Sequence, residues 1–160
     1  MAPMPHVDAP SPTTRIVFVG AFLSAMSATA FLLIGNMFSS TDGDGNIAVI
    51  SVVELLAQDS LQGGWVGLIL ALVLLFPAYL ALMSAVGMWQ RRERFQMAGI
   101  SSVAVLMILF ISIWQWSREE TNAGHNWEVG VGTYGAGISI IALILLWRAG
   151  MWLLEDPYRD

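Results

Sequence analysis

The stretch that decides the fold is "GVGTYGAGISIIALILLW", residues 130–147. Its first six letters fit G-x-G-x-x-G, which in dinucleotide-binding domains marks a phosphate-binding turn between a strand and a helix. That interpretation needs a strand before the glycines, whereas we expect the preceding "SREETNAGHNWE", residues 117–128, to be a polar loop. The residues after the glycines form an apolar run long enough for a membrane helix. We therefore interpret the glycines as a packing surface at the start of a membrane span and reject nucleotide binding.

The composition of the whole chain agrees with a membrane protein. Of its 160 residues, 56% are hydrophobic and 12% are charged, against about 25% charged in a typical soluble domain. The net charge of −5 argues against a nucleic-acid partner, because phosphate binding needs a clustered basic face. The absence of Cys excludes disulfides, iron–sulfur clusters and cysteine nucleophiles. The lipid bilayer is the expected surrounding.

Four stretches approach or exceed the roughly 20 mostly apolar residues that a spanning helix needs. None of them contains Asp, Glu, Lys, Arg or His, and they cover residues 16–38, 65–89, 97–116 and 129–147. We predict an all-α integral membrane protein with a four-helix transmembrane domain at 16–154, between a Pro-rich tail at 1–15 and a C-terminal tail at 155–160. Pro77 should kink the second span, because proline removes a backbone donor and clashes with the preceding turn.

Arginine sets the expected orientation. Six of the seven arginines flank the spans on the side of the two termini, and only Arg118 lies on the other side. The positive-inside rule then places both termini in the cytoplasm. We expect the membrane to be the prokaryotic cytoplasmic (inner) membrane.

Small and aromatic side chains suggest how the spans are held. Glycine, alanine and serine let helices approach closely in lipid, and the packing positions that we predict are Gly20, Ser24, Ser27, Ala28, Gly130, Gly135 and Gly137. Hydroxyl groups within the spans should hydrogen-bond between helices; they include Ser84, Ser102, Thr133 and Ser139. Aromatic and arginine side chains near span ends should anchor the protein at the membrane boundary; these are Trp65, Trp89, Trp116, Trp147 and Arg148.

We make a separate prediction for each of three segments outside the spans. The tail, with prolines at 3, 5, 10 and 12, should extend across another subunit as a clamp, because proline lowers the entropy lost on docking. Residues 46–61 follow an Asp- and Gly-rich turn and predict a short amphipathic helix, either on the outer membrane surface or against a neighbouring subunit. We interpret His125, in the second outer loop, as a solvated residue and not a metal ligand, because no second His is suitably spaced.

The spans contain no acid or base that could catalyse a reaction or relay protons. We predict no cofactor, although a lipid or quinone could pack against the spans. The leading hypothesis is a non-catalytic accessory subunit of a larger respiratory, photosynthetic or transport complex, in contact with other membrane subunits. Two alternatives stay open: a self-assembling pore or transporter component, and a lipid- or quinone-handling protein.

Overall fold

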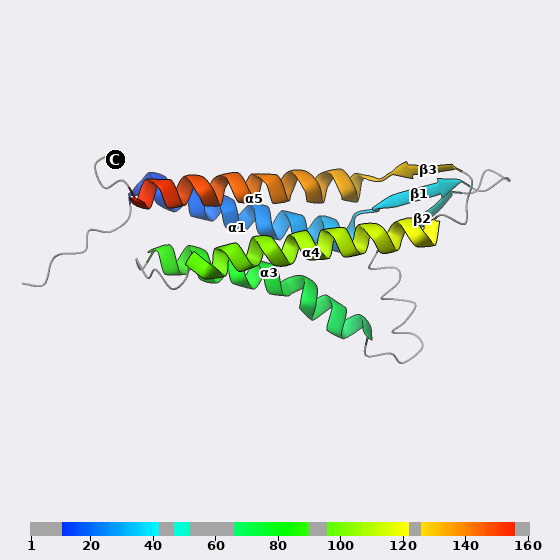
Figure 1. The fold of residues 1–160 in the computed structure, drawn as a ribbon, viewed down its shortest axis with the longest axis horizontal. Helices are drawn as coiled ribbons and strands as arrows, with labels where there is room; N and C mark the ends of the chain where they lie inside the picture. Colours follow the sequence, from blue (N-terminus) through cyan, green and yellow to red (C-terminus); the bar gives the residue numbers. More distant parts are fainter. Residues whose placement is uncertain (1–10, 42–46, 52–65, 90–95, 122–125, 156–160) are drawn as a thin grey trace, which may run out of the picture.

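The structure is a computed structural model that describes residues 11–41, 47–51, 66–89, 96–121 and 126–155. The described chain forms four long helices and a small sheet at one end of them (Figure 1). The helices are α1 (Pro12–Ile34), α3 (Val66–Trp89), α4 (Gln96–Thr121) and α5 (Val131–Glu155), and the strands are β1 (Phe38–Thr41), β2 (Ile47–Ile50) and β3 (Asn126–Val129).

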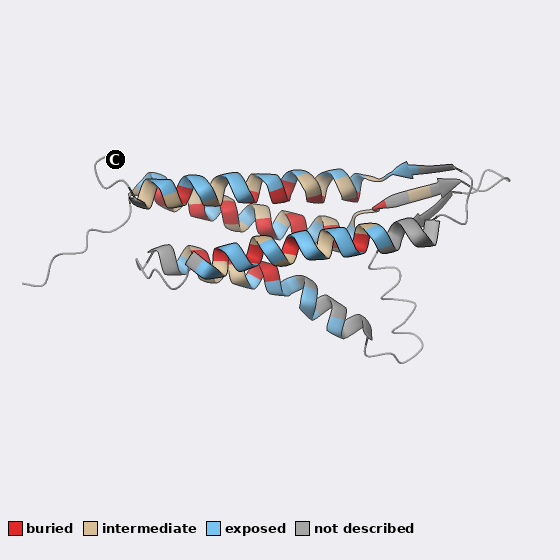
Figure 2. Ribbon diagram, in the orientation of Figure 1, coloured by how far each residue is buried: buried red, intermediate tan, exposed pale blue. Residues whose placement is uncertain are grey.

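Three of the helices are long and apolar enough to cross a membrane. The qualifying segments are Pro12–Ile34, Met97–Gln115 and Val131–Leu154. In α3, which spans 24 residues without a charged side chain, the apolar segment of described side chains is Leu75–Val86. Large apolar side chains stay exposed on the outer faces of all four helices, as Figure 2 shows along α4 and α5. A chain that leaves so much apolar surface outside its own core is suited to contact with lipid.

Helices α1 and α5 lie side by side and antiparallel over almost their whole length (Figure 1). Small residues occupy the centre of the bundle: Ala25 and Ala28 of α1 and Ala136 of α5 are completely buried. Larger side chains, among them Leu32 and Leu106, fill the space around them. The alanines matter because small side chains allow the helix backbones to approach each other closely.

Among the described side chains of α3, the buried ones lie in its second half. They are Pro77, Ala78, Ala81 and Ser84, whereas described side chains of the preceding turns are large, apolar and exposed, and those turns run away from the other helices (Figures 1 and 2). The helix continues through Pro77, which has no N–H to donate to the carbonyl of Val73. The change in course beside Pro77 agrees with the kink expected from the sequence.

The four helices agree with the predicted helical class, and a small sheet that was not expected from the sequence lies at one end of them. Strand β1 is central and pairs antiparallel with β2 and with β3, in the order β2-β1-β3. Residues 47–50 are therefore a strand and not part of the helix expected over 46–61, while 52–61 lie outside the described residues. Residues 126–129, expected to be loop followed by the start of a span, form β3. The strands are four residues long, too short for an alternating pattern to stand out.

Two boundaries of the first span also differ from the prediction. Helix α1 begins at Pro12, because the Ser11 side chain accepts a hydrogen bond from the Thr14 N–H (3.2 Å) and caps the helix. It ends at Ile34, where Gly35 takes an extended conformation, and Phe38 already belongs to β1. Residues 12–14 are thus helical and not part of an extended clamp, while residues 1–10 lie outside the described chain.

The pairing of β1 with β3 can be tested by disulfide formation in this Cys-free chain. Ser39 and Glu128 are directly opposite each other, and opposite residues of an antiparallel pair have Cα atoms at a separation that suits a disulfide. The S39C/E128C variant should therefore cross-link on mild oxidation, seen as a mobility shift that a reductant reverses. The S39C/V129C variant is the control, because adjacent residues of a strand point to opposite faces. Equal cross-linking of both variants would contradict the register.

Candidate functional site

Several hydrogen bonds join the place where α1 passes into β1 to the place where β3 passes into α5. We call this region the glycine junction; it comprises residues 35–37 and 130–133. The Gly130 N–H donates to the Met37 carbonyl (2.8 Å), and the Gly132 N–H donates to the Asn36 carbonyl (2.9 Å). The Thr133 hydroxyl also donates to the Met37 carbonyl (2.8 Å). Two segments nearly a hundred residues apart are thereby joined by three hydrogen bonds.

The glycines of the junction are required by close backbone approach. A Cβ built on Gly132 would lie 2.6 Å from the carbonyl carbon of Gly35, and one built on Gly35 would lie 2.5 Å from the Cα of Gly132. A Cβ on Gly130 would collide with the Asn36 carbonyl oxygen. No side chain larger than hydrogen fits at these three positions unless the backbones separate.

The junction also answers the question raised by the G-x-G-x-x-G pattern. Contrary to our expectation of a loop, a strand does precede these glycines and a helix does follow them. Yet the amides of Gly130 and Gly132 donate to carbonyls of the α1–β1 connection, so they are not available to the phosphates that such a turn would bind. The rejection of nucleotide binding therefore rests on a better reason than the missing strand.

Below the junction, small residues continue the contact between α1 and α5. The ring of Phe31 lies against Gly135, at the place that a Cβ would occupy, and Ser139 hydrogen-bonds to Ser27 (3.1 Å between hydroxyl oxygens). Nearer the chain ends, Gly20 faces Leu146, with 3.3 Å from a Cβ position on Gly20 to the Leu146 Cδ1 atom. The structure thus brings the predicted positions Gly20, Ser27 and Gly135 into one seam.

The remaining predicted packing positions differ in their surroundings. Ala28 is completely buried in the core and Ser24 is half-buried on α1. Gly130 belongs to the junction, whereas Gly137 has open space, with Phe110 Cζ at 4.0 Å from a built Cβ. Gly137 is therefore not a position of close approach. Gly35 lies just beyond the end of α1, and its role in the close approach was not predicted. The sequence signal for that role is the single glycine that interrupts the apolar run "FLLIGNMF".

A second feature is a small cavity between the four helices, near the ends that carry the chain termini. Its polar lining atoms come from Ser84 of α3, Ser102 of α4 and Trp147 of α5. Ser102 donates to the Pro77 carbonyl (2.8 Å), as expected of an interhelical hydroxyl. Ser84 Oγ and Trp147 Nε1 are buried, and neither has a hydrogen-bond partner among the described residues.

The predicted boundary anchors have different positions. The indole nitrogen of Trp147 points into the protein, beside Gly99, and not toward lipid headgroups, whereas Arg148 is exposed. Trp89 is the last residue of α3 and Trp116 lies in the last two turns of α4. Trp65 and His125 lie outside the described residues. The inward orientation of Trp147 depends on Gly99, whose missing side chain leaves room for the indole edge.

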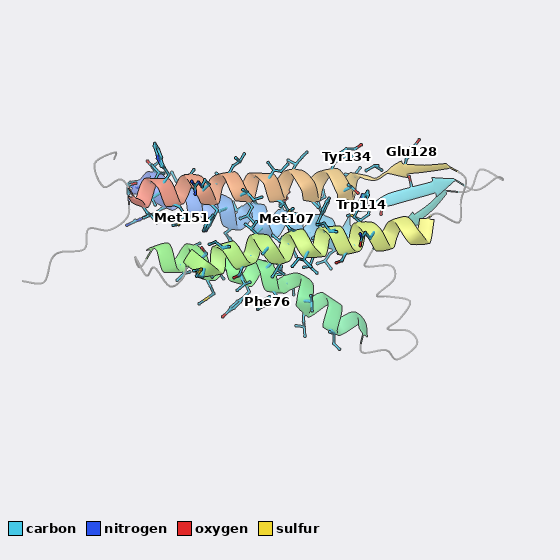
Figure 3. The ribbon with its side chains drawn as sticks, in the orientation of Figure 1. Phe76, Met107, Trp114, Glu128, Tyr134 and Met151 are labelled. Atoms are coloured by element: carbon cyan, nitrogen blue, oxygen red, sulfur yellow. The ribbon has the colours of Figure 1, made fainter. Side chains whose placement is uncertain are left out.

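Within the described ranges, no cluster of three or more His, Cys, Asp or Glu could hold a metal ion. Figure 3 shows the side chains of the bundle; Glu128, at the sheet end, is exposed. Comparison with protein-family models, with curated proteins and with solved structures finds no match.

The role of the junction can be tested with one pair of alanine substitutions. Gly132→Ala should destabilise the protein by about 1–3 kcal/mol, the usual cost of overpacking, because the new methyl group meets the Gly35 backbone. Gly137→Ala, five residues further along the same helix, should be neutral or slightly stabilising, because its methyl group has space. Thermal unfolding in mild detergent, followed by circular dichroism, measures both. Equal unfolding temperatures for the two variants would contradict the close approach.

Proposed function

We propose that this protein is a non-catalytic structural subunit of a larger membrane-protein complex, in contact with lipid on one side and with another subunit on the other. In this proposal all four helices cross the prokaryotic inner membrane and both termini are cytoplasmic. The six-to-one distribution of arginines supports the orientation. The small sheet would then lie on the outer side, because open sheet edges are not tolerated in hydrocarbon.

The observation that carries the proposal is the first half of α3, which leaves the bundle. Ile69, Leu72, Val73, Leu75 and Phe76 are all 42–61% exposed over little more than two turns. After Pro77, the same helix packs well, and Ala78 and Ala81 are 5% exposed. A helix that packs on its own chain along only half its length offers the other half to a second protein.

The rest of the molecule supports a structural role. The glycine junction and the α1–α5 seam join the two ends of the chain into a stiff pair of helices, onto which α4 and the second half of α3 pack. Such a body is well suited to hold the divergent half of α3 in a constant position. A partner helix that packed there would gain van der Waals contacts, which drive association in lipid.

Photo-crosslinking in native membranes tests the proposal. A photoreactive phenylalanine analogue placed at Leu72 or Phe76 should yield adducts with a different polypeptide, several-fold above background. The matched controls are Ile138 and Leu145 on the outer face of α5, which are 67% and 65% exposed and should yield lipid adducts only. Mass spectrometry of the adducts identifies what each position touches.

Two results would contradict the proposal. Lipid adducts alone at Leu72 and Phe76, as at the α5 controls, would mean that the divergent half of α3 faces lipid. Adducts of twice the mass of this chain would instead show a homo-oligomer, which favours the self-assembling pore or transporter component.

A further inference from the structure

We propose that the cavity between Ser84, Ser102 and Trp147 binds one ordered water molecule that links α3, α4 and α5. The first support is the pair of unsatisfied polar atoms. Ser84 is 3% exposed, and its hydroxyl has no hydrogen-bond partner among the described residues. The indole N–H of Trp147 is also buried and also has no partner among them. A buried polar group without a hydrogen bond is costly, and more so within a membrane.

The second support is that the two groups converge on one point. A Cβ built on Gly99 would lie 2.7 Å from Ser84 Oγ and in contact with Trp147 Nε1. Both atoms therefore surround the same small region beside the α4 backbone. They come from different helices, α3 and α5, so a single atom placed between them could bond to both.

The third support is the size of the space. The volume open to the centre of a water molecule is about 10 Å³, close to the minimum that one water requires. A quinone ring or a lipid headgroup is far larger. The size therefore selects water among the hydrogen-bonding ligands that membranes contain.

The polar groups at the site can give one water three hydrogen-bond partners. Water accepts from the Trp147 N–H, which can only donate. It then donates one proton to Ser84 Oγ and the other to Ser102 Oγ, which still has lone pairs because its own proton is donated to the Pro77 carbonyl. The water thereby has three partners, the usual number for a buried water, and connects Trp147 through Ser102 to the turn of α3 where the helix leaves the bundle.

Nuclear magnetic resonance of the ¹⁵N-tryptophan-labelled full chain in deuterated detergent tests the site. The Trp147→Phe variant removes one of seven indole signals and so assigns Trp147. In the unsubstituted protein the Trp147 indole proton should show a dipolar cross-peak at the water frequency and the downfield shift of a hydrogen-bonded N–H. No cross-peak, or a cross-peak to lipid or residual detergent protons instead, would overturn the proposal.

Serine substitutions separate a bound water from the serine hydroxyls themselves. In Ser84→Ala and in Ser102→Ala, two partners remain, so the cross-peak and the downfield shift should persist. In the double variant both should be lost, because the water keeps only the indole N–H. If the indole shift is the same in the unsubstituted protein and in the double variant, no water was bonded to it and the proposal fails.

Ser139→Ala is the matched control. Ser139 is also a buried serine of the bundle, but it lies about two turns before Trp147 on α5 and its hydroxyl bonds to Ser27 of α1. Its substitution should leave the Trp147 signal unchanged. A change as large as that of the double variant would mean that the signal reports general loosening of the bundle, which would overturn the assignment to water.

Discussion

The hydrogen bonds between the α1–β1 connection and the start of α5 are the constraint on which the rest of the structure depends. The first N–H groups of a helix have no partner within that helix, and in α5 the Gly132 N–H donates to Asn36 of the other segment. This bond is available only because Gly35 and Gly132 let the backbones meet. From the junction, the β1–β3 ladder runs one way, beginning with Phe38 opposite Val129, and the α1–α5 seam runs the other.

Helix α3 is attached to the helices of the bundle by weaker interactions. Its packing begins at Pro77, whose carbonyl accepts the Ser102 hydroxyl of α4, and continues through Ala81 and Ser84. Interhelical hydrogen bonds of this kind contribute roughly 0.6 kcal/mol on average in membranes. The proline and the polar cavity thus lie at the part of α3 that holds it on the bundle, and the half before Pro77 is left to other contacts.

Several features of the site were predictable because their physical cause is local. The interhelical hydrogen bonds of Ser102 and Ser139 follow from hydroxyl groups placed in apolar spans, whereas Thr133 bonds to Met37 of the α1–β1 connection. The change in course at Pro77 follows from a missing N–H. The inward orientation of Trp147 was not predictable, because it depends on Gly99, a residue of another helix that leaves room for the indole.

By itself, the sequence determined that the chain is a helical, lipid-compatible protein, because long apolar runs without charged residues have few other stable states. It also determined that glycines would mark the beginning of the last helix. Only the tertiary structure decided that these glycines meet Gly35, that the four-residue strands pair across the chain, and that Trp147 and Ser84 face one cavity. Each of these features is a contact between residues far apart in the chain, so the pattern around either partner alone does not specify it.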